Sequence, residues 1–474
     1  MNKIRFGTDG WRGVMNKTDF SYENVCIFTQ GSLNYLKDIY PQNNLLIVGY
    51  DTRFKSKEFA EIISEIAASN GFKVLLSNSA TPTPFIGHNI ITNQAVAGIM
   101  VTASHNPKQW NGLKVKPTYG GSQRPKEQLL LEKYIQNIKS YQEVKKNPSH
   151  NQNIKFFNPF TDYYSNIQKI IDLESIKSSQ IQIAIDSMFG AGANYIKKIL
   201  SGSNLTIHEI NSEPNPKFPG IRAPEPIEEN LTKLKTFVQK NKFNVGLATD
   251  GDADRLGLVD CHGKFINSSD VFSILCYYEV AIKNNLGPIV KSVTMSHKIN
   301  SICKFFDLET FETPVGFKYL SEKMTEKKAI LAGEESGGFA FNDALGERDG
   351  ILTGLKILEF LSKTKYTIPK ILEKLQSITG EFIYSRQDII LNGRKNDYEK
   401  IVEKLTDHKM STLGGLKITN SNSIDGYKFI LENQNWAAIR FSGTEPLIRL
   451  YSEARNLKLA RKIISDMQSK LNIS

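Results

Sequence analysis

The sequence predicts an α/β protein of several domains, in which three α/β units of similar size precede a smaller α+β unit. Two observations predict this fold. Apolar, β-branched runs alternate with segments of helical period through most of the chain, which is typical of parallel α/β units. The chain also has 474 residues, too many for one hydrophobic core, and this length suggests about three domains of ~150 residues each.

The first unit is expected at residues 1–150 and shows this alternation. Short apolar runs predict buried strands, and a segment of helical period follows the first of them. The strands are expected at residues 45–50, 73–76 and 96–101, and the helix at residues 57–71. The polar, proline-containing residues 141–155 interrupt the pattern, so we interpret them as a linker.

The second and third units are expected at residues 151–262 and 263–376, where the same pattern returns twice. For the second unit it predicts strands at residues 181–185, 205–210, 245–248 and 256–259 and a helix at 194–200. For the third unit it predicts a helix at residues 269–283 and strands at 290–294 and 329–331.

The fourth unit, residues 377–474, differs because most of its predicted elements are strands. The strands are expected at residues 382–391, 426–431 and 436–441, and the helices at 396–405 and 457–471. No short-period repeat is evident in the chain, so a solenoid is not expected.

Composition excludes several classes of protein. The hydrophobic fraction of 40% and the charged fraction of 23% are those of an ordinary globular protein, and no run approaches the ~18 apolar residues of a membrane span. Residues 1–13 have no apolar core, so no signal peptide is expected. The four cysteines form no CxxC pair, which favours a reducing compartment and predicts a cytoplasmic location.

The net charge of +11 has two interpretations, because a basic protein can bind nucleic acid or serve small anionic substrates. The lysines are scattered over predicted helices and loops and build no dense basic arm with interleaved aromatic residues. We therefore expect small anionic substrates and neither a nucleic-acid nor a membrane partner.

Residues 102–107 (TASHNP) begin where the predicted strand 96–101 ends. Catalytic groups in open α/β sheets commonly lie on such loops, although a serine in a polar loop can also be an ordinary turn residue. Ser104 and His105 are adjacent and do not form a hydrolase dyad, because neighbouring side chains usually diverge. The G-x-S-x-G elbow of hydrolases is absent as well.

Residues 250–255 (DGDADR) lie between two predicted strands and give the sharpest signal. Asp250, Asp252 and Asp254 alternate with small residues, which suits a tight loop that presents three carboxylates to one hard cation. A calcium EF-hand does not fit, because Arg255 and Cys261 occupy its glycine and glutamate positions. Magnesium prefers few carboxylates together with a phosphate oxygen, so a phosphorylated partner is expected.

Two further loops carry polar groups suited to a sugar phosphate. Residues 440–446 (RFSGTEP), with Arg449 beyond them, combine backbone N–H groups, hydroxyls and guanidinium groups, as a phosphate dianion requires. Residues 333–338 (GEESGG) follow a short predicted strand, and their carboxylates and hydroxyl could bind sugar hydroxyls, although this signal alone is weak.

Two glycine-containing segments do not predict nucleotide binding. In residues 190–195 the third glycine of a dinucleotide fingerprint is replaced by Tyr195. The pair Gly263-Lys264 is followed by Phe265, so no Walker A loop is present.

Taken together, these segments resemble the α-D-phosphohexomutases, the family of phosphoglucomutases and phosphomannomutases. The resemblance covers the whole chain, and the motifs occur in the family's order. They are FGTDGWRG at residues 6–13, TASHNP at 102–107 with NGLK at 111–114, DGDADR at 250–255, GEES at 333–336 and RFSGTEP at 440–446.

The resemblance implies four domains around a central cleft, the first three with a mixed α/β core and the last with a smaller α+β fold. Ser104 would carry a phosphoryl group, pass it to a hydroxyl of the substrate, and recover the other phosphoryl group from the resulting hexose 1,6-bisphosphate. Mg²⁺ would be held by Ser104 and the three aspartates. The remaining substrate phosphate would be bound by Arg348, Arg440, Ser442, Gly443, Thr444 and Arg449.

Several cations would balance this site, because three aspartates, Mg²⁺ and a dianionic phosphoserine sum to about −3. Arg12, Arg255 and Lys114 occur in the matching motifs. Lys114 is the first candidate for the general acid/base, since a lysine beside other cations can have a lowered pKa. His105 is the second candidate, with orientation of the serine loop as its alternative role. Lys318, in another segment found in the family, is expected to reach the substrate.

The resemblance favours glucose phosphates as substrates. Glu334 and Ser336 match the glucose-type sugar loop, and Gly338 stands where dual glucose/mannose enzymes typically carry histidine. Gly337 departs from the fullest glucose pattern, which has an aromatic residue there, so mannose phosphates remain an alternative. Glucosamine phosphate is less favoured, because that subfamily usually has glutamine at the position of Glu335.

Two functions of other classes compete with a mutase. One is a metal-dependent phosphatase that uses Asp252 or Asp254 as nucleophile or ligand, and the other is a non-catalytic sugar-phosphate-binding protein. The intact Ser104 and aspartates argue against the second. We expect sugar phosphates as the only partners and a monomer or a homodimer.

Overall fold

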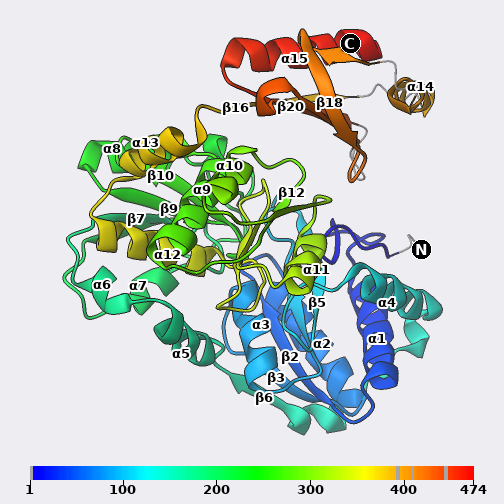
Figure 1. Cartoon of the computed structure of the whole chain (residues 1–474). Coiled ribbons are helices and arrows are strands. Elements are labelled where there is room, and N and C mark those ends of the chain that lie inside the picture. Colours follow the sequence, from blue (N-terminus) through cyan, green and yellow to red (C-terminus); the bar gives the residue numbers. More distant parts are fainter. Residues whose placement is uncertain (1–3, 391–394, 407–409, 442–446, 474) are drawn as a thin grey trace.

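The computed structural model describes residues 4–390, 395–406, 410–441 and 447–473 of the chain. Within these residues the strands form four sheets that follow one another along the chain, each with helices packed against it (Figure 1). No helix in these ranges is long and apolar enough to cross a membrane. The four sheets confirm the predicted succession of three α/β units and one α+β unit.

The first sheet has six strands in the order β1-β5-β4-β2-β3-β6. Its strands β2, β3, β4 and β6 run parallel, whereas β5 pairs antiparallel with both β4 and β1. The strands are β1 (Trp11–Val14), β2 (Leu45–Tyr50), β3 (Lys73–Ser77), β4 (Ala97–Val101), β5 (Trp110–Pro117) and β6 (Ile154–Phe157). The helices are α1 (Tyr22–Ile39), α2 (Ser56–Ser69), α3 (Thr83–Thr92) and α4 (Pro125–Asn137), with the short helices η1 (Tyr141–Glu143) and η2 (Pro148–Asn153).

Side chains that alternate along β2 explain which helices cover each face of this sheet. Leu46 and Val48 are buried in the core formed with α1, α2 and α4. Ile47 points to the opposite face, where it packs with Ile86 and Ile90 of α3. The sheet therefore separates helix α3 from α1, α2 and α4.

The second sheet has five strands in the order β11-β10-β9-β7-β8. In it β7 is parallel to β8 and β9, and β10 is antiparallel to β9 and β11. The elements are α5 (Phe160–Ile170), α6 (Leu173–Lys177), β7 (Ile183–Asp186), α7 (Tyr195–Ile199), β8 (Ile207–Ile210), η3 (Glu228–Asn230), α8 (Thr232–Asn241), β9 (Val245–Thr249), β10 (Leu256–Asp260) and β11 (Phe265–Ile266).

The third sheet has four strands in the order β13-β12-β14-β15, of which only β15 is antiparallel to its neighbour. The elements are α9 (Ser268–Tyr277), the π-helical turn η4 (Tyr278–Ile282), β12 (Ile289–Ser292), α10 (Lys298–Phe305), β13 (Thr310–Thr313), α11 (Phe317–Lys327), β14 (Leu331–Gly333), β15 (Phe339–Phe341), α12 (Gly350–Thr364) and α13 (Ile368–Thr379).

The fourth sheet is antiparallel throughout, in the order β16-β21-β20-β19-β18-β17. The elements are β16 (Ile383–Ile390), α14 (Lys395–Thr406), β17 (Thr412–Leu413), β18 (Leu416–Asn422), β19 (Tyr427–Leu431), η5 (Glu432–Gln434), β20 (Trp436–Phe441), β21 (Leu447–Ala454) and α15 (Leu457–Leu471). This unit has its own core, in which Ile463 and Met467 of α15 pack against the sheet.

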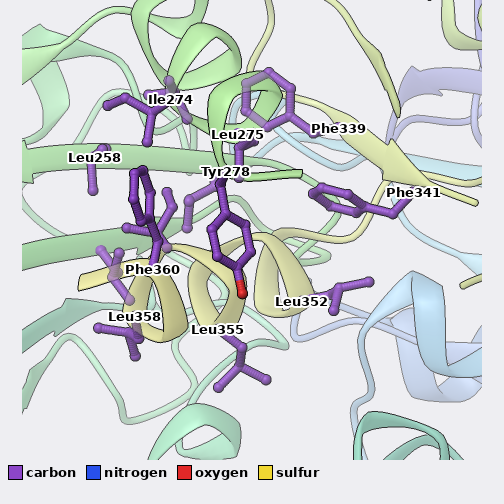
Figure 2. Close-up of a cluster of buried hydrophobic side chains, with 14 of the residues drawn as sticks. Leu258, Ile274, Leu275, Tyr278, Phe339, Phe341, Leu352, Leu355, Leu358 and Phe360 are labelled. Atoms are coloured by element: carbon purple, nitrogen blue, oxygen red, sulfur yellow. The ribbon is translucent and has the colours of Figure 1, made fainter. Parts of the chain in front are cut away.

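The second and third units share one hydrophobic core (Figure 2). Leu258 of β10 belongs to the same buried cluster as Ile274 of α9 and Leu355 of α12. Burial of apolar surface stabilises by about 25 cal/mol per Å², so this continuous core fixes the two units relative to each other.

Most predicted elements are present with ends shifted by a few residues, and β2, β20 and α15 have the predicted bounds. Two strands lie beyond the expected unit boundaries: β6 pairs in the first sheet although that unit was expected to end at residue 150, and β11 pairs in the second sheet beyond residue 262. The expected linker 141–155 contains η1 and η2 and leads directly into β6. Edge strands of this kind depend on pairing with distant residues, which local patterns do not show.

Candidate active site

Ser104 lies on the loop after β4 and is buried. Its φ of +48° is in the left-handed region, which a serine adopts only where its surroundings hold it there. Ser104 Oγ donates a hydrogen bond to Asp250 Oδ2 at 2.7 Å, and His105 Nδ1 lies 3.3 Å from the same hydroxyl oxygen. The predicted serine loop and the predicted aspartate loop therefore meet.

Asp250, Asp252 and Asp254 lie on the tight loop between β9 and β10 and are all buried. One carboxylate oxygen of each lies within 4.8 Å of the others. Burial, together with the charges of Asp254 and Asp252, raises the pKa of Asp250 well above its ordinary value. Asp252 Oδ1 and Asp254 Oδ1 are buried without a hydrogen-bond partner in the described chain. Buried polar atoms normally have partners, so these two oxygens fit the ligand set of a bound metal ion.

Two contacts fix this aspartate loop against the first unit. A Cβ atom on Gly251 would lie 2.4 Å from the carbonyl oxygen of Ser104, so this approach of two backbones requires glycine. On the other side, Thr83 at the start of α3 donates through Oγ1 to Asp252 Oδ2 at 2.6 Å and through N–H to the Asp252 carbonyl at 2.9 Å. The serine and the aspartates therefore have a defined relative position.

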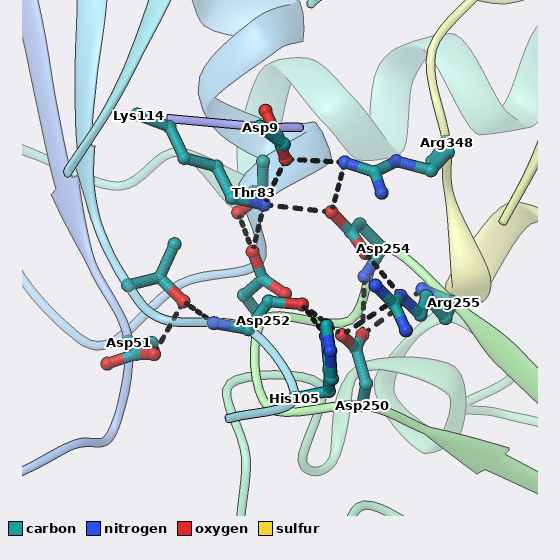
Figure 3. Close-up of polar contacts among 12 residues, drawn as sticks. Asp9, Asp51, Thr83, His105, Lys114, Asp250, Asp252, Asp254, Arg255 and Arg348 are labelled. Atoms are coloured by element: carbon teal, nitrogen blue, oxygen red, sulfur yellow. Dashed lines mark hydrogen bonds and ion pairs between the residues drawn. The ribbon is translucent and has the colours of Figure 1, made fainter. Parts of the chain in front are cut away.

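Lys114 of β5 is only 1% exposed. Its Nζ lies 2.8 Å from Asp9 Oδ2, 2.8 Å from Asp252 Oδ2 and 2.9 Å from Asp254 Oδ2 (Figure 3). Burial alone would lower the pKa of Lys114, but the carboxylates of Asp252, Asp254 and Asp9 raise it. The expectation of a lowered pKa is therefore wrong for this arrangement, because three carboxylates contact Nζ directly and outweigh the neighbouring arginine.

Arg12 and Arg255 bring positive charge to the serine and aspartate loops. Arg12 Nη1 donates to Asn106 Oδ1 at 2.8 Å, and Arg255 Nε lies 3.8 Å from Asp254 Oδ1. Burial and the two guanidinium groups hold the pKa of His105 well below its ordinary value. These neighbours favour the neutral form of the imidazole beside Ser104 Oγ.

Arg348 joins the predicted sugar loop to the aspartates. Its Nη2 lies 3.0 Å from Asp254 Oδ2 and 2.5 Å from Asp9 Oδ2. Its Nη1 lies 3.4 Å from Glu334 Oε1, which also accepts a hydrogen bond from Ser336 Oγ at 2.7 Å. Residues from the first, second and third units thus form one continuous polar cluster.

Lys318 lies between the third unit and the first. Its Nζ donates to Gln128 Oε1 of α4 at 2.9 Å, and burial lowers its pKa. Its hydrogen bond joins it to α4 rather than to the aspartates, so a role in substrate binding stays a prediction.

The predicted phosphate loop is only partly within the described residues. Arg440 Nη2 lies 2.8 Å from Asp425 Oδ2, an oxygen that also accepts the N–H of Val315 at 2.9 Å. Arg449 Nε lies 3.6 Å from Asp388 Oδ2. In the described chain the ion pair of Arg440 leads to the third unit rather than to Ser104. Ser442, Gly443 and Thr444 lie outside the described residues, and the phosphate loop stays a prediction.

Four family models match the chain in succession and together cover most of it. They are described as phosphoglucomutase/phosphomannomutase α/β/α domains I, II and III, at residues 3–142, 161–263 and 268–378, and the C-terminal domain, at residues 392–469. The chain belongs to the phosphoglucomutase/phosphomannomutase family. It is therefore an isomerase-class phosphotransferase, as the resemblance implied.

Relatives in the phosphoglucomutase/phosphomannomutase family span the whole chain. A phosphoglucomutase/phosphomannomutase of Thermococcus kodakarensis is 29% identical over 98% of this chain and 97% of its own. A Methanosphaera stadtmanae protein, provisionally described as a phosphoglucosamine mutase, is 29% identical over 95% of this chain and 94% of its own. The crystal structure of a Thermus thermophilus protein, provisionally described as a phosphomannomutase, has a TM-score of 0.86 and 29% identity, and the match covers 99% of each chain.

Several polar residues of this family member's site were not predicted from its sequence. Asp9 lies in the motif that predicted Arg12, and Thr83 had no distinguishing signal. Lys116 is buried two residues after Lys114 on β5, where its Nζ lies 3.2 Å from Glu347 Oε2. The two-residue period of a strand could have indicated Lys116, because it places both lysines on one face.

Glu335 connects the sugar loop to the C-terminal unit. Its Oε2 lies 3.3 Å from the hydroxyl of Tyr384, and its Oε1 lies 3.4 Å from the hydroxyl of Tyr451 and 3.5 Å from Arg386 Nη1. Glu335, the position at which the glucosamine pattern has glutamine, therefore also contacts the C-terminal unit.

Proposed function

We propose that this phosphotransferase interconverts hexose 1-phosphate and hexose 6-phosphate, with glucose as the preferred sugar, through phosphorylated Ser104 and a hexose 1,6-bisphosphate. One observation carries the proposal: the hydroxyl of Ser104 lies 2.7 Å from an oxygen of Asp250 in a buried triad of aspartates. A nucleophilic oxygen beside a metal-type carboxylate site is what phosphoryl transfer to and from a serine requires.

We further propose Mg²⁺ as the metal, held by Asp250, Asp252, Asp254 and an oxygen at Ser104. The Oδ1 atoms of Asp252 and Asp254, which have no hydrogen-bond partner in the described chain, support this ligand set, because Mg²⁺ prefers oxygen ligands. When bound, Mg²⁺ would neutralise negative charge on the phosphoryl oxygens. The cations of Lys114, Arg12 and Arg255 supply the remaining positive charge around Ser104.

In the proposed step a hydroxyl oxygen of the sugar phosphate attacks the phosphorus on Ser104. The new O–P bond forms as the bond between phosphorus and Ser104 Oγ breaks. Over the whole step, the proton of the sugar hydroxyl is transferred to Ser104 Oγ. The reverse step on the other phosphoryl group regenerates phosphorylated Ser104. Two groups could move this proton: His105, whose Nδ1 lies 3.3 Å from Oγ, and Lys114 among the aspartates.

The packing of the sugar loop accounts for the two glycines that separate it from the dual glucose/mannose pattern and from the fullest glucose pattern. A Cβ atom on Gly338 would lie 2.4 Å from Arg348 Cδ, so a histidine there would displace Arg348 from its ion pairs with Asp254 and Glu334. Gly337 has a φ of +87°, and a Cβ atom on it would lie 2.8 Å from the Leu256 carbonyl oxygen. An aromatic residue is therefore disfavoured at this position.

At the far end of the substrate, we assign the second phosphate to Arg440, with Ser442, Gly443, Thr444 and Arg449. Arg440 supports this role because its Nε and Nη1 are buried without a hydrogen-bond partner in the described chain. The cytoplasmic location and the monomeric or homodimeric state stay predictions.

A rate comparison tests the proposal. Turnover of glucose, mannose and glucosamine 1-phosphates is measured with Mg²⁺ and a catalytic amount of glucose 1,6-bisphosphate, together with released inorganic phosphate. We expect the highest kcat/KM for glucose 1-phosphate, conserved organic phosphate and no turnover by folded Ser104→Ala.

Equal or higher kcat/KM for mannose 1-phosphate would replace the glucose assignment with dual or mannose specificity. Stoichiometric release of inorganic phosphate would favour a phosphatase. Near-normal turnover by a folded Ser104→Ala variant would remove this serine from the mechanism.

A further inference from the structure

Arg53, just after β2, is 4% exposed and makes an unusual set of hydrogen bonds. Its Nη1 donates to the carbonyl oxygens of Pro107 at 3.0 Å and Trp110 at 3.2 Å. Its Nη2 donates to the carbonyl oxygens of Ser104 at 2.5 Å and Asn106 at 2.6 Å. One guanidinium group therefore binds four carbonyl groups of the loop that carries Ser104.

Asp51 holds both Arg53 and the other side of the same loop. Its Oδ2 lies 3.2 Å from Arg53 Nε and accepts a hydrogen bond from Thr102 Oγ1 at 2.7 Å. Thr102 Oγ1 in turn accepts the N–H of Ser104 at 2.8 Å. The backbone N–H and C=O of Ser104 are thus both connected to one carboxylate, the first through Thr102 and the second through Arg53.

The conformation of Ser104 explains why this loop needs such support. A φ of +48° is unfavourable for a serine, and the backbone of Gly251 packs closely against the Ser104 carbonyl. A buried carbonyl without a donor is unfavourable as well. Arg53 therefore supplies the donors that allow the loop to keep this conformation.

The surroundings of Arg53 make direct contact with a substrate phosphate unfavourable. Both Nη atoms are used by carbonyl groups, and the ring of Phe218 lies over the guanidinium group, with the ring centroid 5.1 Å from its central carbon. Phe218 is itself only 2% exposed and comes from the second unit. Arg53 thus lies between the serine loop and a covering aromatic ring.

We propose that Arg53 is a positioning residue, which places Ser104 Oγ for phosphoryl transfer by holding the carbonyl groups of its loop. The proposal rests on the proposed role of Ser104 as the phosphorylated nucleophile. A displacement of about 1 Å at a reacting atom can lower a rate about 100-fold, so loss of this support acts on the transfer step rather than on substrate binding.

The test compares Arg53→Ala, Arg53→Lys and, as a matched control, Thr52→Ala. Thr52 lies in the same loop but donates to the Phe189 carbonyl at 2.8 Å instead of to the serine loop. Each variant is phosphorylated with glucose 1,6-bisphosphate, its Ser104 phosphate is counted by intact mass, and single-turnover transfer to glucose 1-phosphate is timed per phosphorylated site.

We expect Arg53→Ala to lower the single-turnover rate and kcat by about 100-fold while KM changes less than threefold. We expect added guanidinium, but not urea, to raise the single-turnover rate of Arg53→Ala at least tenfold. Arg53→Lys is expected to be intermediate, because one ammonium group cannot bind four carbonyl groups, and Thr52→Ala to keep a rate within threefold of the unchanged protein.

The results separate this proposal from the proposed function. If the unchanged protein carries no phosphate on Ser104, the proposed function fails. If it does, a normal transfer rate per phosphorylated site in Arg53→Ala or Arg53→Lys overturns the positioning role. A raised KM with unchanged kcat would instead identify Arg53 as a substrate-binding residue, and it would overturn the proposal too. Should Arg53→Ala not fold, the rate of Arg53→Lys alone decides.

Discussion

Replacement of Lys114 by methionine tests how charge is balanced in the aspartate cluster. Lys114 Nζ lies 2.8–2.9 Å from three carboxylate oxygens, two of which belong to the buried Asp252 and Asp254. Removal of one partner from a buried ion pair destabilises a protein by about 3–5 kcal/mol, so Lys114→Met should lose at least about 3 kcal/mol of unfolding free energy without a metal ion. The same change removes a positive charge beside the proposed Mg²⁺ ligands. Two unit charges about 4 Å apart interact by about 4 kcal/mol at an effective dielectric constant near 20.

Magnesium should therefore bind Lys114→Met more tightly than the unchanged protein. Even a third of that interaction is about 1.4 kcal/mol, which corresponds to a tenfold lower Kd. Titration calorimetry measures the Kd, and thermal unfolding in EDTA and in Mg²⁺ measures the change in stability. Lys116→Met is the matched control, because Lys116 is equally buried on β5 but pairs with Glu347. It should lose stability without a change in Kd.

Equal Kd values in the unchanged protein and Lys114→Met, within twofold, would refute this reasoning. Such a result would mean that Mg²⁺ binds away from the oxygens that Lys114 contacts. A tenfold tighter Kd in Lys116→Met as well would also contradict it, because the effect would then be a general consequence of removing positive charge.

Three further predictions concern other parts of the structure. Asp252→Asn should weaken Mg²⁺ binding at least tenfold in titration calorimetry. Asp9→Asn, which lies outside the triad, should weaken it by less than tenfold. Equal Kd values for the two variants would place the metal elsewhere. Arg440→Ala should raise the KM for glucose 1-phosphate at least tenfold, since a hydrogen bond to a charged group contributes about 1.5–3 kcal/mol; an unchanged KM would move the phosphate site. Burial lowers the pKa of His88 from 6.5 to about 4, so the unfolded chain binds this proton more tightly and stability is lost as the pH falls through this range. In His88→Gln, the loss of unfolding free energy between pH 7 and pH 4.5 should be smaller by up to about 3 kcal/mol. Urea unfolding at the two pH values measures this loss. An identical pH dependence in both proteins would contradict the lowered pKa of His88.

Sequence patterns predicted the core of the site because its loops begin where apolar strands end. The predicted strands at residues 96–101 and 245–248 correspond to β4 and β9. The carboxyl ends of strands carry functional loops in α/β sheets, and Ser104 and Asp250 lie on the loops that follow. The three aspartates, which alternate with small residues, also predicted that their carboxylates lie together, and in the structure they do.

The supporting contacts could not be predicted, because they join residues that are distant in the chain. Arg53 and the carbonyl group of Ser104 are 51 residues apart, and residues 51–54 read as an ordinary loop after a strand. Thr83 likewise contacts Asp252 only because α3 covers the face of the first sheet that meets the second unit. The pKa of Lys114 was misjudged for the same reason, since the sequence shows neighbouring cations but not the distances to the carboxylates.

The contact between Gly251 and Ser104 restricts how this enzyme can be rebuilt from interchangeable parts. Two main chains from separate units touch there, and no side chain stands between them to absorb a small change in spacing. A chimera that joins the first unit of one relative to the second unit of another must keep both glycine and this spacing. Exchange of whole units is therefore governed by backbone fit at this contact as much as by the residues that perform the chemistry.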